Sequence, residues 1–296
     1  MSFTWPGGPA AIGPTLGTVL DQAEATGIHS VWPMDHFFQI AVAGQSDEPM
    51  LEGWATLAWA AARTTRLQLG TLVTGVHHRH PGALAKLATT VDVLSGGRAW
   101  VGLGAGWNEE ESRGLGIPFP PLAQRFAQLE ETLQILHRMF DGDASPFEGK
   151  QYRLERPLNV PAPVRRPPIL LGGGGEKKTL RMVARYADAC NLFEMVDIRH
   201  KLTVLRSHCE EFGRDYDDIV KTSSGRLGDD RDPGRVAERF AALAESGIDL
   251  AIVDLPDVHE PGLWDFLAEL VRRLEPLGRP TPALLQGNRA SEVRTA

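Results

Sequence analysis

The chain has 296 residues, of which 42% are hydrophobic and 23% are charged, the ordinary composition of a globular protein with a full core. This composition excludes a disordered chain and a collagen, and two cysteines are too few for a disulfide scaffold. We find no secretory leader pattern and no apolar run near the roughly 20 residues that span a bilayer, so we expect a cytoplasmic protein without a membrane partner. A net charge of -7 without a long basic block argues against a nucleic-acid partner.

The predicted elements alternate between strand and helix along most of the chain. Short runs of Val, Ile and Leu predict the strands, and apolar residues at three- and four-residue spacing predict the helices. The predicted strands cover residues 30–34, 67–73, 99–103, 169–171, 189–193, 219–223 and 249–254. The predicted helices cover residues 15–26, 50–64, 82–94, 122–140, 177–186, 198–212, 234–246 and 262–274.

This alternation predicts an α/β fold with a parallel sheet, and its length and repeat number favour a closed (β/α)8 TIM barrel over an open sheet. The remaining strand then falls before Thr15, where only residues 2–5 are free, so the first strand is expected to be abbreviated. Residues 108–168 are too many for a simple connection and are predicted to be an insertion after the fourth strand that covers one mouth of the barrel. We expect one domain over residues 1–280 and a loosely ordered tail over 281–296.

Active sites of such barrels lie at the carboxyl ends of the strands, and two of these ends carry residues of chemical interest. Asp35 and His36 follow the second strand, where an imidazole beside a carboxylate can transfer a proton or contact a planar ring. A histidine that serves only the core is the alternative. Trp107 follows the fourth strand directly and is the best candidate among the tryptophans for lining a flat ligand.

Four consecutive glycines, Gly172, Gly173, Gly174 and Gly175, separate the strand predicted at 169–171, the fifth of the barrel, from the next helix. Such a turn lets backbone N–H groups approach a ligand, and the following helix start favours negative charge, as in a phosphate cradle. Lys177, Lys178 or Arg181 could add a cationic contact. A plain tight turn is the alternative, whereas the spacing of Gly102, Gly104 and Gly106 argues against a dinucleotide-binding motif.

Three neighbouring histidines, His77, His78 and His80, suggest a metal site, but the ligand spacing disfavours it, because adjacent side chains of an extended segment point in opposite directions. We therefore expect no metal here, and His80 is expected to fix the start of the helix that begins near Pro81. The acidic run from Glu109 to Glu111 is interpreted mainly as a helix start, and a carboxylate that faces the pocket is the alternative.

Beyond these single motifs, the chain resembles the luciferase-like monooxygenase superfamily, in particular the branch that uses the deazaflavin coenzyme F-420 (F420). The order and spacing of several segments carry the resemblance over residues 3–274. These segments are Phe3-Thr4-Trp5-Pro6-Gly7-Gly8, Ser30-Val31-Trp32 with Asp35-His36-Phe37, residues 69–76 with Arg79-His80-Pro81, residues 94–98, residues 102–107, Arg125-Phe126, Tyr152-Arg153-Leu154 and the glycine run.

The resemblance implies a parallel barrel whose mouth holds the flavin or deazaflavin ring. It places the cofactor phosphate at Gly172–Gly175, with Ala105, Gly106, Trp107 and Asn108 alongside, and Asp35 and His36 near the ring as candidate catalytic residues. It also implies a non-prolyl cis peptide at or beside Leu72–Val73, behind the ring and next to Thr74. One departure is Trp107, which stands where the sugar-phosphate dehydrogenases have a glutamate acid, and it makes sugar oxidation by their mechanism doubtful.

From these residues we expect an oxidoreductase that transfers a hydride between coenzyme F-420 and a small organic substrate. Two alternatives remain open from sequence alone: an FMN-dependent monooxygenase supplied by a separate reductase, and a barrel that binds a flavin or deazaflavin without turnover. Because dimers are common among such proteins, a homodimer is also expected.

Overall fold

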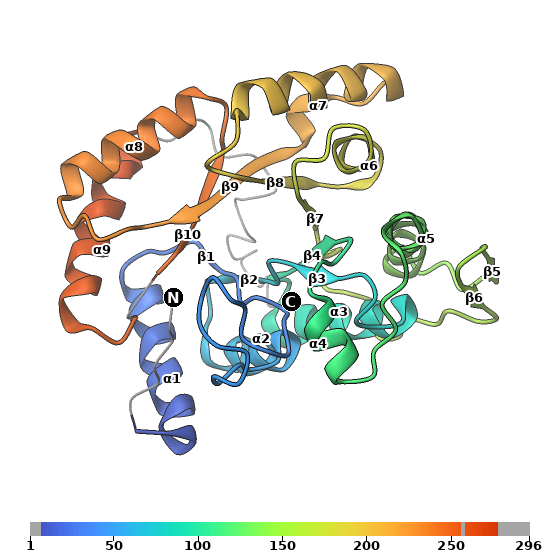
Figure 1. Ribbon diagram of the computed structural model, residues 1–296, viewed down its shortest axis with the longest axis horizontal. Coiled ribbons are helices and arrows are strands. Elements are labelled where there is room, and N and C mark those ends of the chain that lie inside the picture. Colours follow the sequence, from blue (N-terminus) through green and yellow to red (C-terminus); the bar gives the residue numbers. More distant parts are fainter. Residues whose placement is uncertain (1–6, 256–257, 278–296) are drawn as a thin grey trace, which may run out of the picture.

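The computed structural model describes residues 7–255 and 258–277 of the chain. A parallel sheet curls through the centre of this part, and long helices surround it on the outside (Figure 1). The strands pair in the order β1-β2-β4-β7-β8-β9-β10, with β3 pairing to β4. The predicted α/β class with a parallel sheet is therefore confirmed, and the sheet is curled.

Every strand of the curled sheet pairs in parallel with its neighbours, as the alternation of strand and helix predicts. All residues of β4 are buried, because one of its faces is covered by helices and the other lies inside the curl. The strands are β1 (Ser30–Val31), β2 (Gln68–Gly70), β3 (Thr74–Gly75), β4 (Ala99–Gly104), β7 (Ile169–Gly172), β8 (Ala189–Phe193), β9 (Val220–Arg226) and β10 (Leu250–Asp254). A separate antiparallel hairpin consists of β5 (Phe147–Glu148) and β6 (Arg153–Leu154).

The helices pack their apolar sides on the sheet, and several begin or end at residues with clear capping roles. The His80 side chain accepts a hydrogen bond from the Gly82 N–H at 3.2 Å, which confirms the predicted role of His80 at the start of α3. The helices are α1 (Pro9–Ala25), α2 (Gly53–Arg63), α3 (Pro81–Ser95), α4 (Glu109–Gly114), α5 (Leu122–Phe140), α6 (Thr179–Tyr186), α7 (Ile198–Phe212), α8 (Pro233–Glu245) and α9 (Pro261–Leu274), with short 3-10 turns η1 (Tyr216–Asp218) and η2 (Glu275–Leu277).

The strands and helices predicted between residues 15 and 274 all appear, with shifted ends. The largest shift is in α1, which starts at Pro9 instead of Thr15, because Pro9 fits the first helical turn and Pro14 is tolerated inside the helix. The strand β3 and the hairpin β5–β6 were not predicted, since a two-residue strand is detectable only where, as at β1, it belongs to a longer apolar run. The expected first strand at residues 2–5 and the tail at 281–296 lie outside the described residues.

The predicted insertion at 108–168 contains three differently placed parts. The short helix α4 follows β4, α5 packs against α3 and α6 in the outer layer of helices, and the β5–β6 hairpin lies at the outer edge beyond α5 (Figure 1). Of these parts, α4 reaches the residues that follow β1 and β3, as described below. Among the described helices, none has both the length and the apolar character needed to cross a membrane.

Candidate functional site

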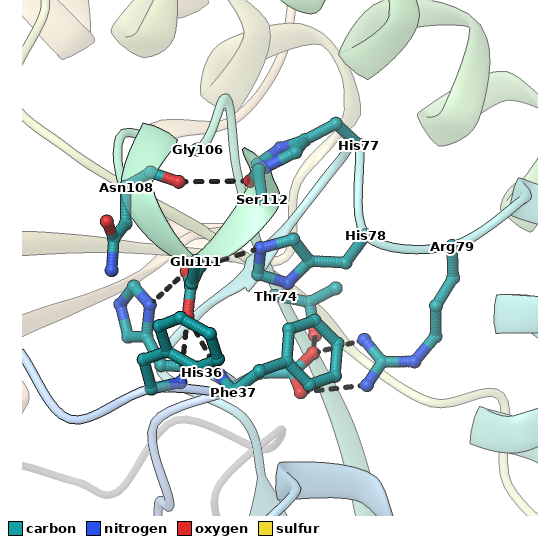
Figure 2. A network of polar contacts seen from close by, with 12 residues as sticks. His36, Phe37, Thr74, His77, His78, Arg79, Gly106, Asn108, Glu111 and Ser112 are labelled. Carbon is teal, nitrogen blue, oxygen red and sulfur yellow. Dashed lines mark hydrogen bonds and ion pairs between the residues drawn. The ribbon is translucent and has the colours of Figure 1, made fainter. Parts of the chain in front are cut away.

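A cluster of polar side chains lies where β1, β3 and β4 end (Figure 2). His36 comes from the segment after β1, and its Nδ1 lies 2.6 Å from Oε1 of Glu111 on α4. The Glu111 side chain is fully buried, while the His36 side chain keeps 12% of its surface exposed. The buried carboxylate thus supports an imidazole that remains accessible from the mouth.

The second oxygen of Glu111 fixes the backbone around His36. Its Oε2 accepts hydrogen bonds from the N–H groups of Phe37 and Phe38 at 2.8 and 3.3 Å. Burial by itself raises the pKa of Glu111, but the hydrogen bonds from His36 and from these two N–H groups outweigh it, and the pKa lies below its usual value. Glu111 is therefore an anion at neutral pH.

Two further histidines, His77 and His78, lie beside this pair on the segment after β3. His77 Nε2 is 2.9 Å from the hydroxyl of Ser112 on α4, and His78 Nε2 is 3.7 Å from Oε1 of Glu111. Burial lowers the pKa of both histidines to about 4, so both are neutral at pH 7. Their Nδ1 atoms are buried and have no hydrogen-bond partner among the described residues.

Asp35 lies behind the cluster and is fully buried. Its carboxylate accepts two hydrogen bonds from the Arg79 guanidinium, at 2.6 and 2.9 Å, and one from the Thr74 hydroxyl at 2.6 Å. Arg79 also pairs with Glu52. Asp35 therefore anchors the segment before His36, and the carboxylate that contacts His36 is Glu111 from a different element.

The floor of the mouth is formed by the segment between β2 and β3. The Leu72–Val73 peptide is cis, as the resemblance implied. A Cβ atom built on Gly104 or Gly172 would lie 2.9 or 3.0 Å from a methyl group of Val73. The two glycines at the ends of β4 and β7 thus leave the space that this valine occupies.

The segment from Ala105 to Asn108 borders the same mouth. Arg125 of α5 donates hydrogen bonds to the carbonyl oxygens of Ala105 and Gly106, at 3.0 and 3.4 Å, and so fixes this turn. The Trp107 side chain is 62% exposed, and its ring centroid is 5.3 Å from that of His36 in an edge-to-face arrangement. Trp107 therefore offers a flat apolar surface next to the imidazole.

The glycine turn lies after β7, on another side of the same mouth. Gly173 has a φ of 116°, which side-chain-bearing residues rarely adopt, and its N–H donates to the Asn191 carbonyl at 3.0 Å. The N–H groups of Gly174 and Gly175 donate no hydrogen bond to any described residue. Free N–H groups on a bare turn that leads into α6 fit an anionic phosphate group.

The cationic residues after the turn are mostly engaged elsewhere. Arg181 pairs with Glu211, and the Lys178 ammonium lies over the Phe126 ring at 5.0 Å from its centroid. The Thr179 hydroxyl, by contrast, would lie only 3.0 Å from a Cβ on Gly175. Thr179 is thus a candidate phosphate contact, which no motif in the sequence indicates.

The predicted site residues therefore gather at one mouth but in two separate groups. His36 with Trp107 and Asn108 forms one, the glycine turn forms the other, and the Leu72–Val73 segment lies on the floor. The sequence does not distinguish Glu111 from its two neighbouring glutamates, and it gives no signal that marks Ser112. Within the described residues, no group of three or more His, Cys, Asp or Glu side chains could hold a metal ion.

The family model described as luciferase-like monooxygenase matches residues 14–247. The chain belongs to this family. It is 31% identical over 246 residues to an F420-dependent glucose-6-phosphate dehydrogenase of Kineococcus radiotolerans, a match that covers 81% of this chain and 71% of the relative. On these grounds the protein is an oxidoreductase.

Solved structures of low identity show the same fold. An F420-dependent tetrahydromethanopterin reductase from Methanopyrus kandleri aligns with a TM-score of 0.74 at 16% identity, covering 90% of this chain and 96% of that one. The oxygenating constituent of 3,6-diketocamphane monooxygenase from Pseudomonas putida, in complex with FMN, aligns with a TM-score of 0.73 at 17% identity, covering 94% and 96%. The fold is therefore common to proteins named for F420 and for FMN.

Proposed function

We propose that this member of the luciferase-like monooxygenase family transfers a hydride between coenzyme F420 and a small organic substrate. The observation that carries the proposal is the placement, at one mouth, of a glycine turn with free N–H groups and an accessible imidazole. These two features suit a cofactor with an anionic tail and a reactive ring. The similarity to a curated F420-dependent dehydrogenase favours F420 over FMN.

In this proposal the N–H groups of Gly174 and Gly175 hold the cofactor phosphate, with Thr179 as a further donor. The Leu72–Val73 segment, Thr74 and the turn from Ala105 to Asn108 define where the ring lies, and His36 supplies the group that exchanges a proton. When bound, F420 supplies the carbon that accepts or releases the hydride. Trp107 excludes water from one side of the imidazole.

For the substrate, we propose only its chemical class. Trp107 offers an apolar ring and no carboxylic acid, and Arg79 beneath the mouth is neutralised by Asp35 and Glu52. These residues favour an uncharged organic substrate over a sugar phosphate.

A cofactor titration tests the proposed function. The purified protein is titrated with F420 and, separately, with FMN, and binding is followed by the fluorescence of each cofactor. We expect F420 to bind with a dissociation constant in the micromolar range or below and reduced F420 to be consumed with a carbonyl or alkene acceptor. Binding of FMN alone contradicts the proposal, and tight F420 binding without turnover of any acceptor supports the non-catalytic alternative.

We also propose a completed eight-stranded barrel, with its remaining strand supplied by residues before α1 (Pro9–Ala25), and a homodimer. Both are proposed on the strength of the family resemblance. An experimental structure with the N-terminal residues placed, together with sedimentation equilibrium, tests them.

A further inference from the structure

The contact between His36 and Glu111 assigns the two ring nitrogens different tasks. Only one of them, Nδ1, faces the carboxylate, at 2.6 Å. The other, Nε2, is on the opposite side of the ring from Glu111 (Figure 2). An imidazole is neutral when one nitrogen carries the proton, and the hydrogen bond at one nitrogen decides which one that is.

Glu111 cannot donate the hydrogen atom in this contact. Its carboxylate already accepts from the N–H groups of Phe37 and Phe38, and these hydrogen bonds together with the His36 contact lower its pKa despite its burial. An ionised carboxylate only accepts hydrogen bonds. His36 Nδ1 must therefore be the donor, which leaves Nε2 without a proton in the neutral ring.

We propose that Glu111 is a positioning residue that holds His36 with its proton on Nδ1 and presents the bare Nε2 to the mouth as the proton acceptor. This inference deepens the proposed function, on which it rests for the identity of the molecule that meets Nε2. When Nε2 takes a proton from a bound hydroxyl, the donor loses that proton, the ring becomes an imidazolium, and the adjacent Glu111 carboxylate balances the new charge. In the reverse direction Nε2 returns the same proton.

The neighbouring groups leave this role to Glu111. His78 also approaches Oε1 of Glu111, but at 3.7 Å, beyond a hydrogen bond, and burial keeps it neutral. Arg79 is occupied by Asp35 and Glu52. The next two carboxylates on the same helix, Glu109 and Glu110, are exposed, and Glu109 pairs with Arg113.

The tautomer of His36 can be measured directly in the cofactor-free protein. Two-bond nitrogen–proton correlation NMR at pH 8 on the ¹⁵N-labelled wild type, with His36 assigned by comparison with His36→Asn, distinguishes a protonated from a bare ring nitrogen. We expect a protonated Nδ1 and a bare Nε2. A protonated Nε2 in the wild type overturns the proposal without any further variant.

Two variants and a matched control sharpen the test. Glu111→Ala removes the acceptor, so the Nε2-protonated form, which histidine prefers in water, becomes the majority. Glu111→Gln gives the same shift, because its single amide oxygen is held by the N–H groups of Phe37 and Phe38 and its NH2 group then faces Nδ1 as a donor, and Glu110→Gln on the same helix changes nothing. A His36 tautomer that is the same in wild type and Glu111→Ala, with both proteins folded by circular dichroism, overturns the proposal, because a merely structural Glu111 predicts that result.

Cofactor binding separates this inference from the proposed function. We expect F420 turnover to fall at least tenfold in Glu111→Ala and in Glu111→Gln, because neither variant has the carboxylate that balances the imidazolium, and to be kept in Glu110→Gln. If the tautomers follow the expectation but the wild type does not bind F420, the proposed function fails and the role of Glu111 stands. If F420 binds and reacts but the His36 tautomer is the same with and without the Glu111 carboxylate, the inference about Glu111 is wrong and the proposed function stands.

Discussion

The side of the mouth formed by β1, β3 and β4 is built from side chains, whereas the side formed by β7 is built from backbone. On the first side, His36, His78 and Glu111 contact one another within a buried network. On the second, the glycine turn has no side chains and leaves the N–H groups of Gly174 and Gly175 without a described partner. Groups that hold protons need precise side-chain geometry, and an anion needs only oriented N–H groups.

The largest expected effect is on catalysis, from His36→Ala. Removing a positioned acid or base slows turnover by about 10² to 10⁴-fold. The affinity for F420 should change little, because the phosphate contacts lie in the glycine turn on the other side of the mouth. Steady-state kinetics and a fluorescence titration measure both quantities. If the variant loses affinity and keeps turnover, the division of labour between the two sides is wrong.

The next effect concerns the free energy of unfolding. Arg79→Met leaves the fully buried Asp35 carboxylate without its guanidinium partner and should destabilise the fold by about 3 to 5 kcal/mol. Arg181→Met, which breaks the exposed pair with Glu211 below the glycine turn, serves as the matched control and should cost less than about 1 kcal/mol. Urea unfolding of both variants measures the difference. Equal losses contradict the view that the buried network carries the stability of the mouth.

The histidines of the first side give a pH dependence of stability. The pKa of His78 is about 4 in the folded chain against 6.5 for an ordinary histidine, so the unfolded chain binds more protons between these values. The free energy of unfolding should therefore fall as the pH drops from 6.5 towards 4, by up to about 3 kcal/mol for this residue.

The measurement is a series of urea unfolding curves from pH 7.5 to 4.5, with His78→Gln as the comparison. Glu111 has a lowered pKa, so its own contribution is present above 4.5 and is lost only below that pH, outside this range. We expect a shallower slope in the variant. A slope unchanged by His78→Gln rules out this histidine as a source of the acid sensitivity.

The smallest effect concerns the backbone side of the mouth. A Cβ on Gly174 would meet only ordinary contacts, 3.6 Å or more from its neighbours, whereas Gly173 has a positive φ that makes substitution there strained. Gly174→Val should thus fold normally but weaken F420 binding by about tenfold to a hundredfold, because the valine side chain keeps the phosphate away from the N–H groups and a hydrogen bond to a charged group contributes about 1.5 to 3 kcal/mol. Gly262→Val, at an open position in α9, is the control. Unchanged affinity in Gly174→Val argues against the phosphate assignment.

The sequence predicts the seven strands of the main path and the long helices because their apolar periodicity is strong. It also singles out His36 and the glycine run, since residues that follow parallel strands meet at one edge. It does not separate Glu111 from Glu109 and Glu110. That distinction depends on α4 turning one carboxylate towards a segment 75 positions away, a tertiary contact without a local signal.

The same limit applies to Asp35. As the neighbour of His36 in sequence it was the natural partner for the imidazole, but alternation of side chains along an extended segment turns it to the opposite side, against Arg79 and Thr74. The cis peptide at Leu72–Val73 and the partly exposed Trp107 were reached through the family resemblance or from position, and periodicity alone indicates neither.

The valine on the floor of the mouth gives this scaffold a simple means of changing its depth. Because Gly104 and Gly172 surrender their side-chain volume to Val73, the three positions share one space. Shortening Val73 to alanine would free space between β4 and β7 without touching the imidazole or the glycine turn, whereas a methyl group on either glycine would compete with the valine for that space. Redesign for bulkier reactants could therefore begin at the single position Val73.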